Sequence, residues 1–220
     1  MGKHWVREQV RKDVVQESVD KGVRWVDHNR SQALAWTGGV AAAALVAVIA
    51  FTHVRSSHDG AWTRFSVAQG MAYSGQPDKA LAEIKALQDE QGNTDAAGFG
   101  RILAGDIDYT RGSYKEALDQ YAAVLERGKP ASLQPIALSD TAISQEASGQ
   151  FQQAAQTAQH FLDQYPDHFL APQVHGCLAR AQVAMGQLDA AKTTWQKISL
   201  QYPDTSWAAW AQARLQAASK

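Results

Sequence analysis

Cysteine is almost absent from this chain of 220 residues, which contains only Cys177. One cysteine cannot form an internal disulfide, and it excludes every zinc or iron–sulfur site that needs several thiolates. An excess of one charge is missing too, because 21 Lys and Arg are balanced by 22 Asp and Glu. A chain without a basic excess has no general electrostatic reason to bind nucleic acid. We therefore expect a buried free thiol at Cys177 and no nucleic-acid partner.

Catalytic motifs are also missing. The sequence contains no phosphate-binding loop, no nucleophile elbow and no zinc-protease helix. His160, His168 and His175 lie near Asp163 and Asp167, but their spacing does not put two histidines one turn apart on a common helix face. We therefore expect no enzyme activity, no cofactor, no metal site and no small-molecule substrate.

Charged residues are absent from Ser31 to Thr52, the one long apolar run in the chain. About 20 mostly apolar residues cross a bilayer core as a helix, so residues 31–54 are predicted to be a transmembrane anchor. A cleaved signal peptide has a shorter start and a shorter apolar run. Five basic residues in 11–30, against two in 53–72, place the N-terminus in the cytoplasm and the C-terminal part outside it.

Small residues spaced four apart lie within the predicted anchor. Such residues on one helix face let a second transmembrane helix approach closely. We expect packing against a partner in the membrane at Gly38, Gly39, Ala42, Ala43 and Ala47. An alanine-rich anchor without a partner is the alternative.

Residues 1–30 are predicted to be a cytoplasmic basic helical arm. Its valines form a helical stripe that shifts along the arm, and Trp5 and Trp25 lie near its two ends. A basic helix with tryptophans can lie along the inner leaflet or dock on a partner. A partly ordered tail is the alternative.

Residues 55–220 contain an internal repeat marked by four glycines, each 37 residues after the last: Gly75, Gly112, Gly149 and Gly186. A small residue lies seven positions before each glycine and an alanine five positions after it. The glycine permits the tight turn that ends a first helix, and the small residues let two helices approach. One helical hairpin cannot bury its apolar face alone, so stacked hairpins must share a continuous core.

This pattern resembles the tetratricopeptide repeat over roughly residues 60–218. Two segments supply the closing turn of that repeat, Tyr165-Pro166-Asp167 and Tyr202-Pro203-Asp204. The period of 37 exceeds the usual 34, and the first two repeats lack the closing proline. We expect an all-α, right-handed helical solenoid of about four 37-residue hairpins. A final helix with Trp207, Trp210 and Leu215 is expected to cap it.

Tetratricopeptide arrays usually bind peptides or protein surfaces in a groove lined by their first helices. The resemblance maps this protein-binding groove to Trp62, Phe65, Gln69, Phe99, Ile102, Asp106, Tyr109, Ile143, Glu146, Gln173 and Arg180. The first two repeats make the groove aromatic, which is typical of interaction sites. For Trp62 and Phe65, packing at the uncapped N-terminal end of the solenoid is an equal alternative.

A short arm, one span and a repeat domain together look like the bacterial single-span periplasmic tetratricopeptide proteins associated with the Sec translocon. This resemblance implies a single-pass inner-membrane protein with a periplasmic C-terminal domain. It further implies an ancillary role beside the channel, with translocon subunits and periplasmic chaperones as partners. One alternative is an accessory subunit of another inner-membrane complex. Another is an envelope coordinator that resembles periplasmic repeat proteins of cell division.

Overall fold

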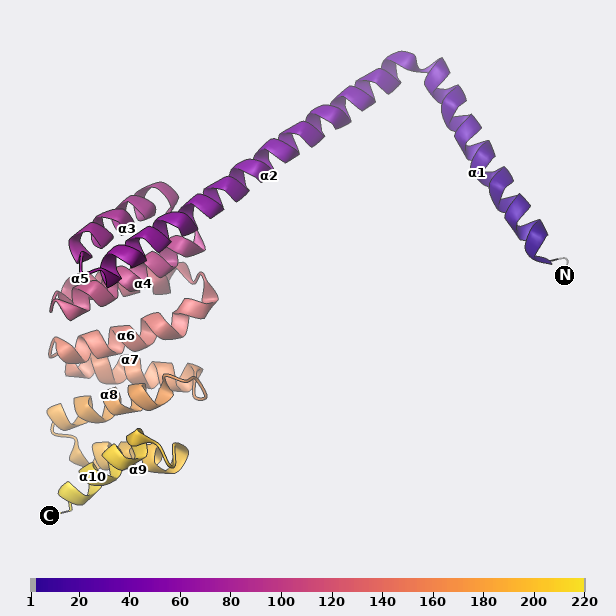
Figure 1. The fold of residues 1–220 in the computed structure, drawn as a ribbon. Helices are drawn as coiled ribbons and strands as arrows, with labels where there is room; N and C mark the ends of the chain where they lie inside the picture. The colour runs from indigo at the N-terminus through magenta and orange to yellow at the C-terminus, as the bar shows by residue number, and fades with distance from the viewer. Residues whose placement is uncertain (1–2, 220) are drawn as a thin grey trace. The chain divides into compact units, whose positions relative to one another are not determined.

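The computed structural model describes residues 3–219, without the side chains of residues 3–15, 33, 53, 54 and 56–58. The described chain contains ten α-helices, one short 3₁₀ turn and no strand (Figure 1). The all-α class expected from the sequence is therefore confirmed. The chain divides into two compact units, residues 1–56 and 57–220, and α2 (Arg30–Tyr73) runs across the division.

The first unit contains α1 (Lys3–His28) and the first part of α2. Every described side chain of α1 is exposed, including Trp25 and the valines near it. Its ion pair between Lys21 and Glu17 (2.8 Å) is also exposed, so it adds little to stability. The side chain of Trp5 and the first part of the valine stripe lie outside the described residues.

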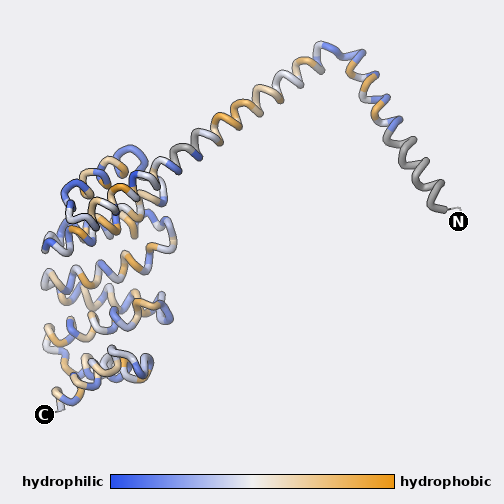
Figure 2. The backbone as a smooth tube through the Cα atoms, viewed as in Figure 1, coloured by the Kyte–Doolittle hydropathy of each residue, from blue (hydrophilic) through white to orange (hydrophobic). Residues whose placement is uncertain are grey.

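One stretch of α2, Arg30–Thr52, has the length and composition of a membrane span. Its 23 residues have a mean hydropathy of 2.1 and none of it is buried, and Figure 2 shows the apolar colour along it. The hydroxyls of Thr37 and Thr52 donate to carbonyl oxygens of their own helix, so these polar groups have partners without water. A Cβ added at Gly38 or Gly39 would meet no atom within 4 Å. Among the described residues, none packs on Gly38 or Gly39 of the predicted small-residue face.

The second unit is a stack of helical hairpins. The first helices of the hairpins are the end of α2, α4 (Asp95–Thr110), α6 (Gln134–Ala147) and α8 (Ala171–Ala184). Their second helices are α3 (Pro77–Gln91), α5 (Tyr114–Arg127), α7 (Phe151–Gln164) and α9 (Leu188–Gln201). The 3₁₀ turn Ala131–Leu133 precedes α6, and α10 (Ser206–Ala217) ends the stack. Figure 1 shows α4 to α10 arranged in successive layers, as the predicted four hairpins and final helix require.

The four repeat glycines make the turns inside the hairpins. Their φ angles are 74°, 78°, 79° and 74° for Gly75, Gly112, Gly149 and Gly186. Each glycine is followed by a residue whose amide donates to the carbonyl five positions earlier, at 2.8–2.9 Å. This 6→1 hydrogen bond and the left-handed glycine define a Schellman motif. The 37-residue period is thus the spacing of a repeated helix C-terminus, whose left-handed backbone conformation only glycine adopts without strain.

Replacing Gly149 with alanine is expected to lower the free energy of unfolding by about 1–2 kcal/mol, because a Cβ is strained at positive φ. No atom lies within 4 Å of the added Cβ, so the cost comes from the backbone alone. The matched control is Gly70→Ala in α2, which is also uncrowded but has a helical backbone. That change is expected to be neutral or stabilising. Urea denaturation of both variants measures the difference; equal costs would contradict it.

The core of each hairpin is built from residues at matching repeat positions. The alanines five positions after the glycines, Ala80, Ala117, Ala154 and Ala191, are fully buried. Larger side chains twelve positions after the glycines, Leu87, Val124, Phe161 and Ile198, are fully buried as well. The packing predicted for the alanines is therefore confirmed at every repeat.

Gly105 of α4 packs directly against Tyr121 of α5 in the second hairpin. A Cβ there would lie 2.7 Å from Cζ of Tyr121 on α5 and still closer to Cε1. The Tyr121 ring is buried, and its hydroxyl donates to Asp106 Oδ1 at 2.8 Å. Glycine at this position makes room for the ring that fills the gap between the helices.

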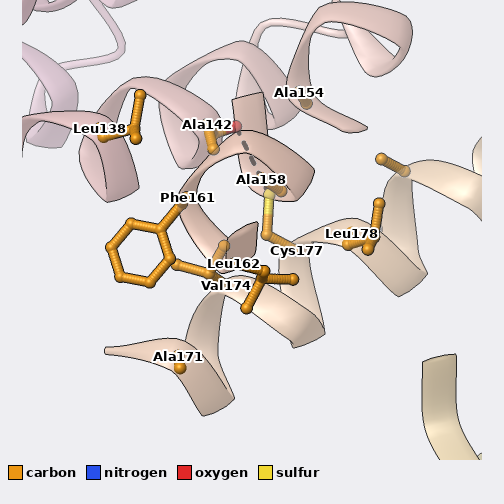
Figure 3. Packing of buried hydrophobic residues seen from close by; sticks show 11 residues of the cluster. Leu138, Ala142, Ala154, Ala158, Phe161, Leu162, Ala171, Val174, Cys177 and Leu178 are labelled. Carbon is orange, nitrogen blue, oxygen red and sulfur yellow. Dashed lines mark hydrogen bonds between the residues drawn. The ribbon is translucent and has the colours of Figure 1, made fainter. Parts of the chain in front are cut away.

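Phe161 lies in a cluster formed by α6, α7 and α8 (Figure 3). Leu162, Val174 and Cys177 belong to the same cluster, and all are buried. The thiol of Cys177 lies 3.5 Å from the carbonyl oxygen of Ala142, and burial raises its pKa. Cys177 is therefore the buried free thiol that the sequence predicts.

The last helix covers the final hairpin. Trp207, Trp210 and Leu215 of α10 pack against buried Ala179, Ala191, Trp195 and Ile198. The Thr205 hydroxyl caps α10 by accepting from the amide of Ala208 at 3.2 Å. The predicted capping helix is confirmed.

Candidate protein-binding face

All eleven residues expected in the binding groove lie on the first helices α2, α4, α6 and α8. We refer to the surface that they define as the first-helix face. Asp106 and Arg180 are exposed, and the other nine are half-buried. The residues chosen by repeat spacing are therefore all at least partly exposed on the first helices.

Three aromatic rings meet at the first end of this face. Trp62 and Phe65 of α2 lie 5.8 Å apart between ring centroids, and Phe99 of α4 lies 5.4 Å from Trp62 and 6.0 Å from Phe65. Trp62 and Phe65 also pack against buried alanines and Leu87. The rings thus take part in the packing of the first hairpins and keep a partly exposed surface.

Two carboxylates, Asp106 of α4 and Asp140 of α6, mark the middle of the face. Although Asp106 as a whole is exposed, neighbouring groups partly desolvate its carboxylate and raise its pKa, and the hydrogen bond from Tyr121 opposes that rise. Burial, and then the charge of Asp106, raises the pKa of Asp140 to about 7. Asp140 was not expected from the sequence, although it lies one helical turn before Ile143, which was. No lysine or arginine forms an ion pair with either carboxylate within the described chain.

The stability of the solenoid is expected to fall as pH rises from about 4 to about 7. The pKa of Asp140 is about 7 in the folded protein and about 3.9 in an unfolded chain. The folded state therefore binds more protons in this window, and the contribution of Asp140 is complete below it and lost above it. Asp140→Asn should flatten this pH dependence and be more stable than the wild type above about pH 7. Thermal unfolding across the range measures it, with exposed Asp119→Asn as control; an unchanged profile for Asp140→Asn would refute it.

An ion pair joins α6 and α8 on the same face. Arg180 donates from Nε to Glu146 Oε1 (2.6 Å) and from Nη2 to Oε2 (2.7 Å). The Glu146 side chain is only 16% exposed and that of Arg180 is 43% exposed. This bidentate geometry is more specific than a surface ion pair. Hydrogen bonding to Glu146 accordingly raises the pKa of Arg180.

Tyr109 follows Asp106 by three positions in α4, and the charges of Glu146 and Arg180 act on it. Its ring centroid is 5.6 Å from that of Tyr114, and burial, then the charges of Tyr114 and Glu146, raises its pKa. The structure thus brings together three predicted residues from three hairpins: Tyr109, Glu146 and Arg180. Ile102 and Ile143 pack partly into the core below. Gln69 and Gln173 are half-buried on α2 and α8.

Three cavities among the described residues lie elsewhere, beside α7, α8 and α9. One of about 590 Å³ is lined by His168 and His175 together with Asp163 and Asp167. His160, which was considered with them, does not line it. No group of three or more His, Cys, Asp or Glu that could hold a metal ion occurs in the described part of the chain.

Comparisons with known proteins agree with the repeat architecture. The tetratricopeptide repeat family matches residues 146–217, which include α7 to α10. These are the two hairpins whose closing Tyr-Pro-Asp turns are plain in the sequence. No curated protein matches the chain. The family match and the fold indicate a protein-interaction scaffold, and no enzyme family is indicated.

Solved structures share the fold at low sequence identity. The nearly identical TPR-like repeats of a putative kinesin light chain from Podosopora anserina have a TM-score of 0.58 and 16% identity, covering 71% of this chain and 83% of that one. A single-substitution variant of that protein gives a TM-score of 0.59 over the same coverage, also at 16% identity. The MamA RS-1 ArsTM double mutant gives 0.56 and 16%, covering 73% and 95%. These likenesses show a tetratricopeptide-like solenoid and nothing further.

Proposed function

We propose that this protein is a membrane-anchored, non-enzymatic scaffold that binds other proteins through its first-helix face. The observation that carries the proposal is the composition of that face. The face carries aromatic rings at Trp62, Phe65 and Phe99, two carboxylates and the Glu146–Arg180 ion pair. Aromatic groups with interspersed charges are typical of surfaces that bind proteins.

The proposed organisation is a cytoplasmic arm at residues 1–30, a transmembrane anchor at 31–54 and a periplasmic repeat domain at 55–220. The length and hydropathy of Arg30–Thr52 and the basic residues before it support this arrangement. In spheroplasts, protease added outside is expected to digest the domain after Arg55. Full protection of that domain would reverse the proposed orientation.

The proposed role is assistance to secretion or envelope assembly beside the Sec translocon. The arrangement of arm, span and repeat domain supports it, as does the small-residue face at Gly38 and Gly39, which suits a membrane partner. The same face fits an accessory subunit of another inner-membrane complex. A coordinator of the cell envelope or of division is a further alternative.

Crosslinking in intact cells, with a tag after Lys220, separates these roles. Translocon subunits and periplasmic chaperones among the co-purified proteins are expected for the secretion role. One unrelated membrane complex at fixed stoichiometry would instead identify a structural subunit. Recovery of division proteins would support the coordinator.

Tyr109→Ala is expected to weaken partner capture about tenfold while helicity stays unchanged, because a partly buried aromatic anchor often dominates an interface. The matched control is Tyr73→Ala, since Tyr73 is 83% exposed and lies outside the predicted face. Quantitative recovery of the crosslinked partner measures both variants. Equal capture by the Tyr109 variant and the wild type would place the binding site elsewhere.

A further inference from the structure

We infer that the solenoid has a second protein-binding site, a cleft between α7 and α9 that binds an extended peptide segment through its backbone. This site is separate from the first-helix face and does not depend on the function proposed for that face. Three adjoining cavities of about 590, 220 and 290 Å³ form it. Gln159 lines all three, His175 and Lys197 join the first to the second, and Leu178 and Gln182 join the second to the third. We call this continuous space the α8 cleft.

One face of α8 forms the floor of the cleft. His175, Leu178, Gln182 and Met185 line it, and their spacing of three and four places them on a single helical stripe. From His175 to Met185 the floor is about 15 Å long. An extended chain advances about 3.4 Å per residue, so the floor matches a segment of about four or five residues.

Glutamines supply much of the polar surface of the walls. Gln152, Gln156 and Gln159 line the α7 side, and Gln201 lines the α9 side. On the floor, Gln182 Oε1 accepts from the Thr194 hydroxyl at 2.8 Å, which holds that side chain in place. Gln159 Nε2 likewise donates to Asp163 Oδ1 at 2.7 Å. A carboxamide both donates and accepts, so the groups of Gln152 and Gln156 and the remaining Oε1 of Gln159 match the N–H and C=O of an extended backbone.

The wide end of the cleft has a polar atom without a partner. His175 is 8% exposed, and its Nδ1 has no hydrogen-bond partner. Burial, then the charge of Lys197, lowers the pKa of His175 to about 4, so the ring is neutral at pH 7. A buried nitrogen without a partner is unfavourable. Because Nδ1 is itself buried, an occupant of the cleft would meet the neutral ring as part of the floor and would not reach this nitrogen.

The charges and the exposed ring at the wide end of the cleft indicate which side chains the bound peptide carries. Asp163 and Asp167 line this end against the single ammonium of Lys197, so the charge balance favours a basic residue. Phe169, which is 77% exposed, also lines it and offers a ring to an apolar side chain or to the stem of a lysine. A segment with a basic residue next to an aromatic one fits both features. A helical occupant fits less well, because its backbone groups are already paired and would leave the amide walls without partners.

Fluorescence anisotropy with the full chain in lipid nanodiscs tests this site. The probe is a fluorescein-labelled peptide of about eight residues that contains a lysine next to a phenylalanine, flanked by alanine. The double variant Gln152→Ala/Gln156→Ala is expected to weaken binding about tenfold, since it removes two amide contacts. Gln153→Ala is the matched control, because Gln153 is exposed on α7 but does not line the cleft. Gln153→Ala should bind as the wild type does.

Recognition of the peptide backbone is tested with a second probe in the same assay. A probe with N-methylated peptide bonds and unchanged side chains is expected to lose at least tenfold in affinity. Equal binding of the methylated probe, no binding of the parent probe, or equal loss in the Gln153 control would each overturn the proposal. Light scattering that shows a dimer dissociated by Thr193→Trp would assign the cleft to a second copy instead. Tyr109→Ala should leave probe binding unchanged, which separates failure of this site from failure of the first-helix face.

Discussion

Replacing Phe161 with alanine is expected to lower the free energy of unfolding of the repeat unit by about 3–5 kcal/mol. The ring is fully buried, and its centroid lies 5.5 Å from that of Tyr165 and 5.8 Å from that of His168. Alanine removes the ring from a cluster that joins α6, α7 and α8, and helices held on both sides cannot close the cavity fully. Each kcal/mol lowers the melting temperature of a unit of this size by about 2–4 °C.

Phe169→Ala is the matched control for Phe161. The two residues have the same side chain, but Phe169 is 77% exposed in the turn that follows α7. Its replacement is expected to change the free energy of unfolding by less than about 0.5 kcal/mol. Urea denaturation followed by far-ultraviolet circular dichroism measures both variants. A Phe161 variant as stable as the Phe169 variant would mean that the cluster between these hairpins is wrongly assigned.

Replacing Gly105 with alanine is expected to cost about 2–4 kcal/mol, an unusually large penalty for a glycine inside a helix. Alanine normally favours a helix by about 1 kcal/mol. Here the added Cβ would lie 2.7 Å from Tyr121 Cζ, so α4 and α5 must separate or the ring must leave its place. Either movement also disturbs the hydrogen bond from Tyr121 to Asp106, and overpacking alone costs about 1–3 kcal/mol.

A double-mutant cycle identifies the cause of the Gly105 effect. In the Tyr121→Leu background the ring is gone, so Gly105→Ala is expected to cost less than about 0.5 kcal/mol and to be nearly neutral. Gly70→Ala in α2, where no atom lies within 4 Å, gives the baseline for an uncrowded helical glycine. Additive costs at Gly105 and Tyr121 would show that the clash is not the source of the penalty.

The repeat could be predicted from the sequence because its signals are local. Gly112 and Gly149 end helices by a left-handed turn that depends only on the residues around it. Ala117 and Ala154 follow five positions later and are fully buried, as the spacing predicts. Local periodicity also indicated the final helix, whose Trp207 packs on the last hairpin.

The polar contacts between repeats could not be predicted in the same way. Asp140 was missed because a half-buried aspartate in a first helix has no distinctive sequence signal, and its pKa depends on Asp106 in another hairpin. Glu146 and Arg180 were both expected on the first-helix face, but their 34-residue separation did not indicate a bidentate ion pair. The α8 cleft could not be predicted either, because it exists only where α7 and α9 are held at a particular distance from each other.

The sequence by itself determined the helices, the glycine turns, the repeat positions of the core and the one apolar stretch long enough to cross a membrane. Each of these depends on spacing within a few helical turns, or on composition over about 20 residues. Only the tertiary structure decided which side chains of different hairpins meet. The small rotation between neighbouring hairpins sets those distances, and it results from many packing contacts summed along the stack. The Asp106–Asp140 pair, the Glu146–Arg180 bridge and the α8 cleft all depend on it.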